Sequence, residues 1–198
     1  MLVDNPIQIT LQELRALAAE AKGKVNKLIL HWTAGRYNQV FDDYHLSIGP
    51  EGQLYQTCQS LGDHKSHTFN RNTGAVGIAL CCCLDAICGR TPKEMDFGPY
   101  PPTPLQLDSM ARVVAVLCEA LGLSISFDTV ITHAEAAFMD GYGPGSSYPD
   151  IRWDLFVFRY PPLKEDLCYG GVTLRQMASW YAGLYRQREE ARASSVPF

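Results

Sequence analysis

Two short apolar runs in this sequence each end on a histidine. Residues 27–30 lead into His31, and residues 130–132 lead into His133. Such runs predict buried strands, and a histidine at the exit of a buried strand lies where the sheet stops and a pocket can begin. A single histidine of this kind is more often a hydrogen-bonded core residue. Two of them, far apart in the chain, predict one shared site that can bind a metal ion.

A third protein ligand is needed, because a catalytic zinc ion usually has three protein ligands and one open position. Asp154 is the first candidate, since it stands between Trp153 and Leu155, an unusual setting for a carboxylate without a partner. A glycine-rich loop before it could fold it back toward His133. Spacing alone leaves Asp140 and Asp150 as alternatives.

Length and charge limit the class of protein. The 198 residues contain no obvious linker, so we expect one domain over residues 1–198, with a frayed tail over 190–198. The net charge of -4 gives no reason to expect nucleic acid as a partner. No signal peptide or membrane-spanning run is visible, which predicts cytoplasmic synthesis without membrane insertion. We expect a monomer.

The seven cysteines favour reduced, core-packed thiols rather than a disulfide or zinc framework. Their number is odd, and no paired CxxC spacing is present. Cys81, Cys82 and Cys83 continue the apolar run of residues 75–80, so we expect them to alternate between the two faces of one strand.

Capping and turn signals predict the remaining elements. Thr10 with Glu13 begins a helix that ends before Gly23, and a polar loop is expected over 63–74. Turn residues at 49–52 predict a hairpin between 44–48 and 53–56. Two further helices are expected, one starting at Thr103-Pro104 and ending at Gly122, and one capped by Thr173 and Gln176 with Leu174, Met177, Trp180, Tyr181 and Leu184 on one side.

The order of these motifs resembles that of zinc N-acetylmuramoyl-L-alanine amidases, a superfamily that includes phage lysozyme-type amidases and peptidoglycan recognition proteins. The motifs lie at residues 31–35 (HWTAG), 44–46 (YHL), 49–52 (GPEG), 77–80 (GIAL), 132–135 (THAE) and 152–155 (RWDL). The resemblance implies a three-layer α/β fold, with a central mixed β-sheet flanked by helices. It also implies one zinc ion per chain, in a groove that accepts peptidoglycan.

The resemblance also implies roles for individual residues. His31, His133 and Asp154 match the zinc ligands. Tyr44 matches a tyrosine that lies near the zinc-bound water. Arg152 stands where many members have a lysine, and its charge would hold the carbonyl oxygen as that oxygen turns negative.

Other polar residues near these motifs are weaker candidates. His45, His64 and Asn70 are expected to contact substrate, and Glu135 is expected to contact substrate or to cap and orient its neighbours. Ala79 departs from one branch of the superfamily, in which a glutamate at this position is a proposed general base.

These residues predict a peptidoglycan hydrolase that cleaves the amide between N-acetylmuramic acid and L-alanine of the stem peptide. A phage or prophage endolysin and a secreted antibacterial effector both fit, each acting on the cell wall after release or export. Two alternatives remain: a recognition module that binds peptidoglycan without cleaving it, and a thiol enzyme that pairs a cysteine with His64 or His67.

Overall fold

The chain folds around a mixed β-sheet. The computed structural model describes residues 1–88, 91–143, 154–160 and 164–194. Within them, the sheet has the strand order β1-β4-β3-β5-β2-β6, from β1 (Ile7–Ile9), β2 (Lys27–Trp32), β3 (Leu46–Ile48), β4 (Leu54–Gln56), β5 (Ala75–Leu80) and β6 (Val130–Thr132). The pairs β3·β5, β5·β2 and β2·β6 are parallel, whereas β4 is antiparallel to both β1 and β3. The predicted central mixed sheet is therefore confirmed, and so is the predicted hairpin.

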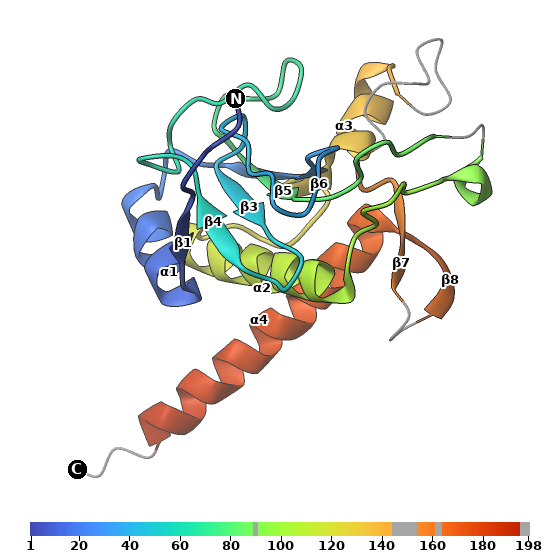
Figure 1. Cartoon of the computed structure of the whole chain (residues 1–198). Coiled ribbons are helices and arrows are strands. Elements are labelled where there is room, and N and C mark those ends of the chain that lie inside the picture. The colour runs from blue at the N-terminus through green and yellow to red at the C-terminus, as the bar shows by residue number, and fades with distance from the viewer. Residues whose placement is uncertain (89–90, 144–153, 161–163, 195–198) are drawn as a thin grey trace.

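Helices cover both faces of this sheet (Figure 1). On one side, α2 (Pro104–Leu121) packs against α1 (Leu11–Glu20) and α4 (Gly170–Ser194). On the other side, α3 (His133–Asp140) contacts β2 and β6. A short 3-10 helix, η1 (Pro92–Glu94), and a separate antiparallel hairpin of β7 (Val157–Tyr160) and β8 (Lys164–Tyr169) complete the described chain. This arrangement is the three-layer α/β fold that the sequence predicts.

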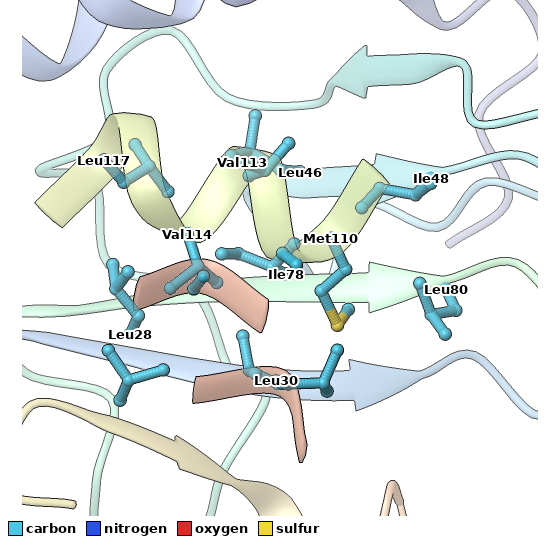
Figure 2. Close-up of a cluster of buried hydrophobic side chains, with 14 of the residues drawn as sticks. Leu28, Leu30, Leu46, Ile48, Ile78, Leu80, Met110, Val113, Val114 and Leu117 are labelled. Atoms are coloured by element: carbon cyan, nitrogen blue, oxygen red, sulfur yellow. The ribbon is translucent and has the colours of Figure 1, made fainter. Parts of the chain in front are cut away.

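Successive side chains of the central strands point to opposite faces of the sheet, so one set forms the core and the other faces the site. Leu28 and Leu30 of β2 and Ile78 of β5 point toward α2 and are fully buried (Figure 2). Each buried side chain of this size contributes about 1.5–3 kcal/mol. Ile29 faces the opposite side, where it packs with residues of β6 and α3. Because side chains alternate, His31 shares the face of Ile29 and points away from the main core.

Two of the predicted helix boundaries are set by capping boxes. The side chain of Thr10 accepts a hydrogen bond from the backbone of Glu13, and Thr103 and Gln106 repeat this arrangement at the start of α2. Gly122 ends α2 in the left-handed conformation, with a φ of 75°, which glycine adopts without steric cost. The signals read from the sequence therefore operate as expected in α1 and α2.

The predicted continuation of the strand through the cysteines is wrong. β5 ends at Leu80, and Cys81, Cys82 and Cys83 follow it as irregular backbone, all fully buried. The chain turns at Cys83, which has a φ of 67° and donates its N–H to the carbonyl of Tyr100. All seven cysteines have free thiols.

The last helix also differs from its prediction. It begins at Gly170, so Thr173 lies inside the helix rather than at its cap, and it continues to Ser194, beyond the predicted start of a frayed tail at residue 190. Gly170 donates its N–H to the carbonyl of Phe156, and a Cβ at this glycine would meet the Leu155 carbonyl oxygen at 1.8 Å. Close packing against the segment just before β7 therefore fixes the start of α4. No helix in the described part of the chain is long and apolar enough to span a bilayer.

Candidate metal centre

Three side chains from distant parts of the sequence converge above the ends of the central strands. Nδ1 of His31 lies 3.0 Å from Nδ1 of His133 and 3.2 Å from Oδ2 of Asp154. The same carboxylate oxygen lies 3.3 Å from Nδ1 of His133. The two histidines are at most 3% exposed, and the side chain of Asp154 is 13% exposed. The structure thus brings together the three residues that the sequence suggests as metal ligands.

Strand register and a helix cap explain this convergence. Leu30 of β2 pairs with Thr132 of β6, so His31 and His133 are the next residues along two adjacent parallel strands. The backbone becomes helical at His133 because Thr132 and Glu135 form a capping box at the start of α3. Asp154 reaches this point because its carbonyl accepts a hydrogen bond from the N–H of Ala134, at 3.3 Å.

The donor set fits a zinc ion. Zinc in proteins prefers tetrahedral coordination with bonds of about 2.0–2.1 Å to histidine nitrogen and carboxylate oxygen, which places neighbouring donors about 3.3 Å apart. The three donor separations here, 3.0, 3.2 and 3.3 Å, form one face of such a tetrahedron. A fourth position remains for a water molecule or a substrate oxygen.

The electrostatics of the cluster favour an ionised carboxylate. Burial by itself raises the pKa of Asp154, but the neighbouring imidazoles of His133 and His31 outweigh this effect and hold the pKa below its ordinary value. Asp154 is therefore an anion at neutral pH, as a metal ligand must be.

Two further side chains, those of His67 and Thr68, contact the nitrogen of His31 that faces away from the cluster. Nε2 of His31 is 3.2 Å from Nδ1 of His67 and 3.3 Å from Oγ1 of Thr68. A Cβ added to Gly77 would meet the His67 ring at 2.7 Å, so only glycine in β5 lets this ring lie against the sheet. Burial, together with the charge of His31, lowers the pKa of His67 to about 2. His67 is therefore neutral and can accept a hydrogen bond from His31.

Tyr44 is the one predicted catalytic residue within the described part of the chain. Its ring centroid lies 5.1 Å from that of His31, and its hydroxyl donates to the carbonyl of Trp32 at 3.4 Å. The side chain is partly exposed beside the metal cluster. Arg152 and the alternative ligand Asp150 lie outside the described residues.

The residues expected to contact substrate occupy different environments. His45 is fully buried, where its Nε2 faces the carbonyl of Asp63 at 2.8 Å and its Nδ1 accepts from the N–H of Gly77 at 3.0 Å. His64 and Asn70 are exposed in the loop between β4 and β5. His45 therefore connects this loop to the sheet.

Glu135 and Asp140 are held by arginines. Both oxygens of Glu135 accept from Arg175 of α4 at 2.8 Å, and Oδ1 and Oδ2 of Asp140 accept from Arg71 at 2.7 and 2.6 Å. Glu135 also accepts from the N–H of Thr132, so it has the capping role expected from the sequence. The pairing of Asp140 with Arg71 leaves Asp154 as the third candidate ligand among the described carboxylates.

Sequence reasoning did not assign His67 and Thr68 to the metal centre. The loop over residues 63–74 is polar and has no periodicity, so it predicts a solvated segment, yet both side chains are buried. The available signal is Gly77, because a glycine inside a strand often marks the close approach of another group.

A mixed sheet with two histidines at the ends of adjacent central strands, joined by an aspartate from a later segment, defines an α/β protein with a candidate site for one metal ion. The chain belongs to the N-acetylmuramoyl-L-alanine amidase family, whose sequence profile matches residues 21–146. The matched range contains His31 and His133 but stops short of Asp154, so the assignment of Asp154 rests on the geometry.

Two solved structures show limited similarity. The endolysin N-acetylmuramoyl-L-alanine amidase LysCS from Clostridium intestinale URNW is 18% identical, with a TM-score of 0.39 over 56% of this chain and 69% of that chain. The amidase LysC from the same organism is 18% identical, with a TM-score of 0.42 over 64% of this chain and 80% of that chain. No curated protein sequence matches the chain significantly. The family assignment therefore rests on the sequence profile.

Proposed function

We propose that this protein is a zinc-dependent amidase that hydrolyses the bond between the lactyl group of N-acetylmuramic acid and L-alanine of the stem peptide. The observation that carries the proposal is the triangle of His31, His133 and Asp154 donors, found in a chain of the N-acetylmuramoyl-L-alanine amidase family. Its spacing suits zinc, and two imidazoles with one carboxylate form a typical donor set of catalytic zinc sites.

When bound at this site, zinc would polarise the scissile carbonyl and lower the pKa of water to about 7. The surrounding residues then have separate tasks. His67 and Thr68 lie within hydrogen-bond distance of Nε2 of His31 and hold its ring so that Nδ1 faces the cluster. The role proposed for Tyr44, whose ring lies beside that of His31, is to orient the water or donate to the carbonyl oxygen, which requires its hydroxyl to turn from the carbonyl of Trp32.

Arg152 is proposed to supply positive charge when the carbonyl oxygen becomes negative. The guanidinium is always protonated, so it acts by stabilising this charge and not by donating a proton. This role rests on the resemblance of residues 152–155 to the amidase motif.

The intact donor set favours an enzyme over a recognition module. A module that only binds peptidoglycan needs no open metal position, whereas all three donors are present here within 4.8 Å of one another. A thiol enzyme is disfavoured, because burial raises the pKa of Cys58 to about 11 and the pKa of both Cys81 and Cys118 to about 12. These thiols stay protonated at neutral pH and are poor nucleophiles.

We further propose that the protein acts on the cell wall as a phage or prophage endolysin or as an antibacterial effector. Peptidoglycan is then its macromolecular partner, and its action requires release or export from the cell in which it is made.

Digestion of purified peptidoglycan followed by mass spectrometry tests the reaction. We expect stem peptides with a free L-alanine amino group and glycan strands without peptides, loss of both after chelation, and recovery on addition of zinc. Cleavage of a glycosidic bond or of a bond within the stem peptide would contradict the proposal. Inhibition by iodoacetamide but not by chelators would instead support a thiol enzyme.

A further inference from the structure

A pocket on the face of the sheet that α2 and α4 cover, remote from the metal centre, is lined by aromatic and polar side chains. It lies between α2, α4 and the end of β7 and has a volume of about 450 Å³. Asp108, Tyr160, Gln176, Met177, Trp180 and Tyr181 line it. α2 and α4 cover the face opposite α3, and the C-terminal half of α4 extends beyond the sheet (Figure 1). The pocket is therefore separate from the cluster around His31 and His133.

Trp180 is the most unusual residue of this pocket. It belongs to the apolar side predicted for this helix, yet it is 60% exposed, whereas its neighbour Tyr181 is only 8% exposed. The two ring centroids lie 4.8 Å apart with an interplanar angle of 70°. Single exposed apolar residues are common on protein surfaces. An exposed indole that forms one wall of a cavity beside Tyr160 and Met177 instead suggests a ligand.

The polar groups of the pocket are held in place by contacts with each other. The hydroxyl of Tyr181 donates to Oδ1 of Asp108, and Nε of Arg112 donates to Oδ2 at 2.8 Å. The Arg112 guanidinium also lies over the Tyr181 ring, with Cζ 4.6 Å from its centroid. Burial and the contact with Asp108 raise the pKa of Tyr181 to about 12, so this hydroxyl remains a donor.

The charge of the pocket favours a neutral ligand. Asp108 is the one charged side chain among its lining residues, and Arg112 balances that charge. Each carboxylate oxygen can accept a further hydrogen bond, and the Gln176 amide can both donate and accept. A charged peptide would find no complementary charge here, whereas sugar hydroxyls and acetamide groups match these donors and acceptors.

We propose that this pocket binds a β-1,4-linked N-acetylated amino sugar of the glycan strand. One face of a sugar ring presents C–H groups that pack on the indole of Trp180, while the equatorial hydroxyls reach Asp108 and Gln176. The choice of a glycan rests on the proposed peptidoglycan substrate. A second attachment point away from the metal centre would raise the effective concentration of the enzyme on its polymer.

Calorimetric titration with chitotetraose tests the proposal, because this tetramer of N-acetylglucosamine has no stem peptide and no amidase-sensitive bond. We expect wild type to bind it and Trp180→Ala to bind about tenfold more weakly or worse. Gln176→Ala should weaken binding by a smaller factor. Leu105→Ala is the matched control, since Leu105 is 52% exposed on α2 but lies outside this pocket.

Equal affinity of wild type and Trp180→Ala for chitotetraose would overturn the proposal. So would a wild type that does not bind chitotetraose but forms a dimer in sedimentation, with Trp180→Ala monomeric, because a second copy would then occupy the pocket.

Cleavage of a soluble muropeptide, measured on the same variants, separates this inference from the proposed function. If wild type cleaves the muropeptide but Trp180→Ala binds chitotetraose as wild type does, only the proposal of a glycan-binding pocket is contradicted. If chitotetraose binding depends on Trp180 but wild type does not cleave the muropeptide, only the amidase proposal is contradicted. We expect Leu105→Ala, outside the pocket, to cleave the soluble muropeptide at the wild-type rate.

Discussion

Nε2 of His31 lies 3.2 Å from Nδ1 of His67, although the two residues belong to a strand and to a polar loop. This contact leaves Nδ1 of His31 directed at His133 and Asp154. A ligand imidazole whose second nitrogen is held in this way has a fixed ring orientation and tautomer. His67 is therefore a positioning residue for the metal centre.

We predict that His67→Phe, which keeps an aromatic ring but removes the acceptor, weakens zinc binding about 10- to 100-fold. Thr68→Val should act in the same direction, because the Thr68 hydroxyl is the other polar group within hydrogen-bond distance of Nε2 of His31. Competition with a chromogenic chelator gives the zinc affinity. His64→Ala is the control, since His64 is exposed in the same loop. Unchanged affinity in both His67→Phe and Thr68→Val would show that neither residue positions His31.

Glu135 is expected to affect stability and not substrate affinity. Glu135→Ala removes the cap of α3 and leaves Arg175, whose side chain is 14% exposed, without its carboxylate partner. We predict a loss of about 1–3 kcal/mol in the free energy of unfolding, with KM for a muropeptide unchanged. Chemical denaturation and steady-state kinetics measure the two quantities.

Glu13→Ala provides a matched control for Glu135→Ala. Glu13 closes the same kind of capping box on α1, and the contacts that lower its pKa come from Thr10. Its loss should therefore destabilise the protein less than the loss of Glu135. A raised KM in Glu135→Ala at unchanged stability would instead favour a substrate contact.

The buried histidine His45 predicts a dependence of stability on pH. Burial lowers its pKa, so the folded state holds the neutral form, which accepts from the N–H of Gly77. The unfolded chain takes up a proton near pH 6.5, and the stability contributed by His45 is present above that pH and lost as the pH falls below it. The slope for one such group is at most about 1.4 kcal/mol per pH unit.

His45→Asn keeps an acceptor but removes the titrating group. We predict that the free energy of unfolding of this variant falls less steeply than that of wild type between pH 7 and pH 5, as measured by urea denaturation with matched zinc. Parallel pH profiles for the two proteins would mean that His45 does not contribute.

The sequence predicts the residues whose positions depend on local pattern. His31 and His133 follow strand-like runs, and the Thr132–Glu135 capping box is visible as a motif. The position of His67 depends instead on a long-range approach to Gly77. A polar loop has no hydrophobic periodicity from which such a contact could be predicted.

Local sequence patterns also did not predict the short strands or the element boundaries that tertiary contacts determine. β1 has three residues, and the β7·β8 hairpin pairs strands that the sequence does not mark. The start of α4 is fixed by the contact of Gly170 with the carbonyls of Leu155 and Phe156, and not by the capping signal at Thr173. Tertiary packing therefore overrides the local cap.

Arg152 is predicted to act on turnover and not on zinc binding. The scissile amide is neutral in the ground state and gains negative charge after attack by water, so a nearby guanidinium stabilises the later state more. Arg152→Ala should keep its zinc and its melting temperature, and should lose about 100- to 1,000-fold in turnover. Arg152→Lys should recover part of that loss. Muropeptide turnover within about threefold of wild type in Arg152→Ala would exclude this role.

Zinc content, measured by elemental analysis of purified wild-type and variant proteins, tests the central claim most directly. We predict one zinc ion per chain in wild type, none in His31→Ala or His133→Ala, and weakened zinc binding with loss of peptidoglycan lysis in Asp154→Ala. Asp140→Ala, which removes a carboxylate paired with Arg71, should keep both zinc and lysis. Full zinc occupancy in either histidine variant, or loss of zinc from Asp140→Ala but not from Asp154→Ala, would contradict the account.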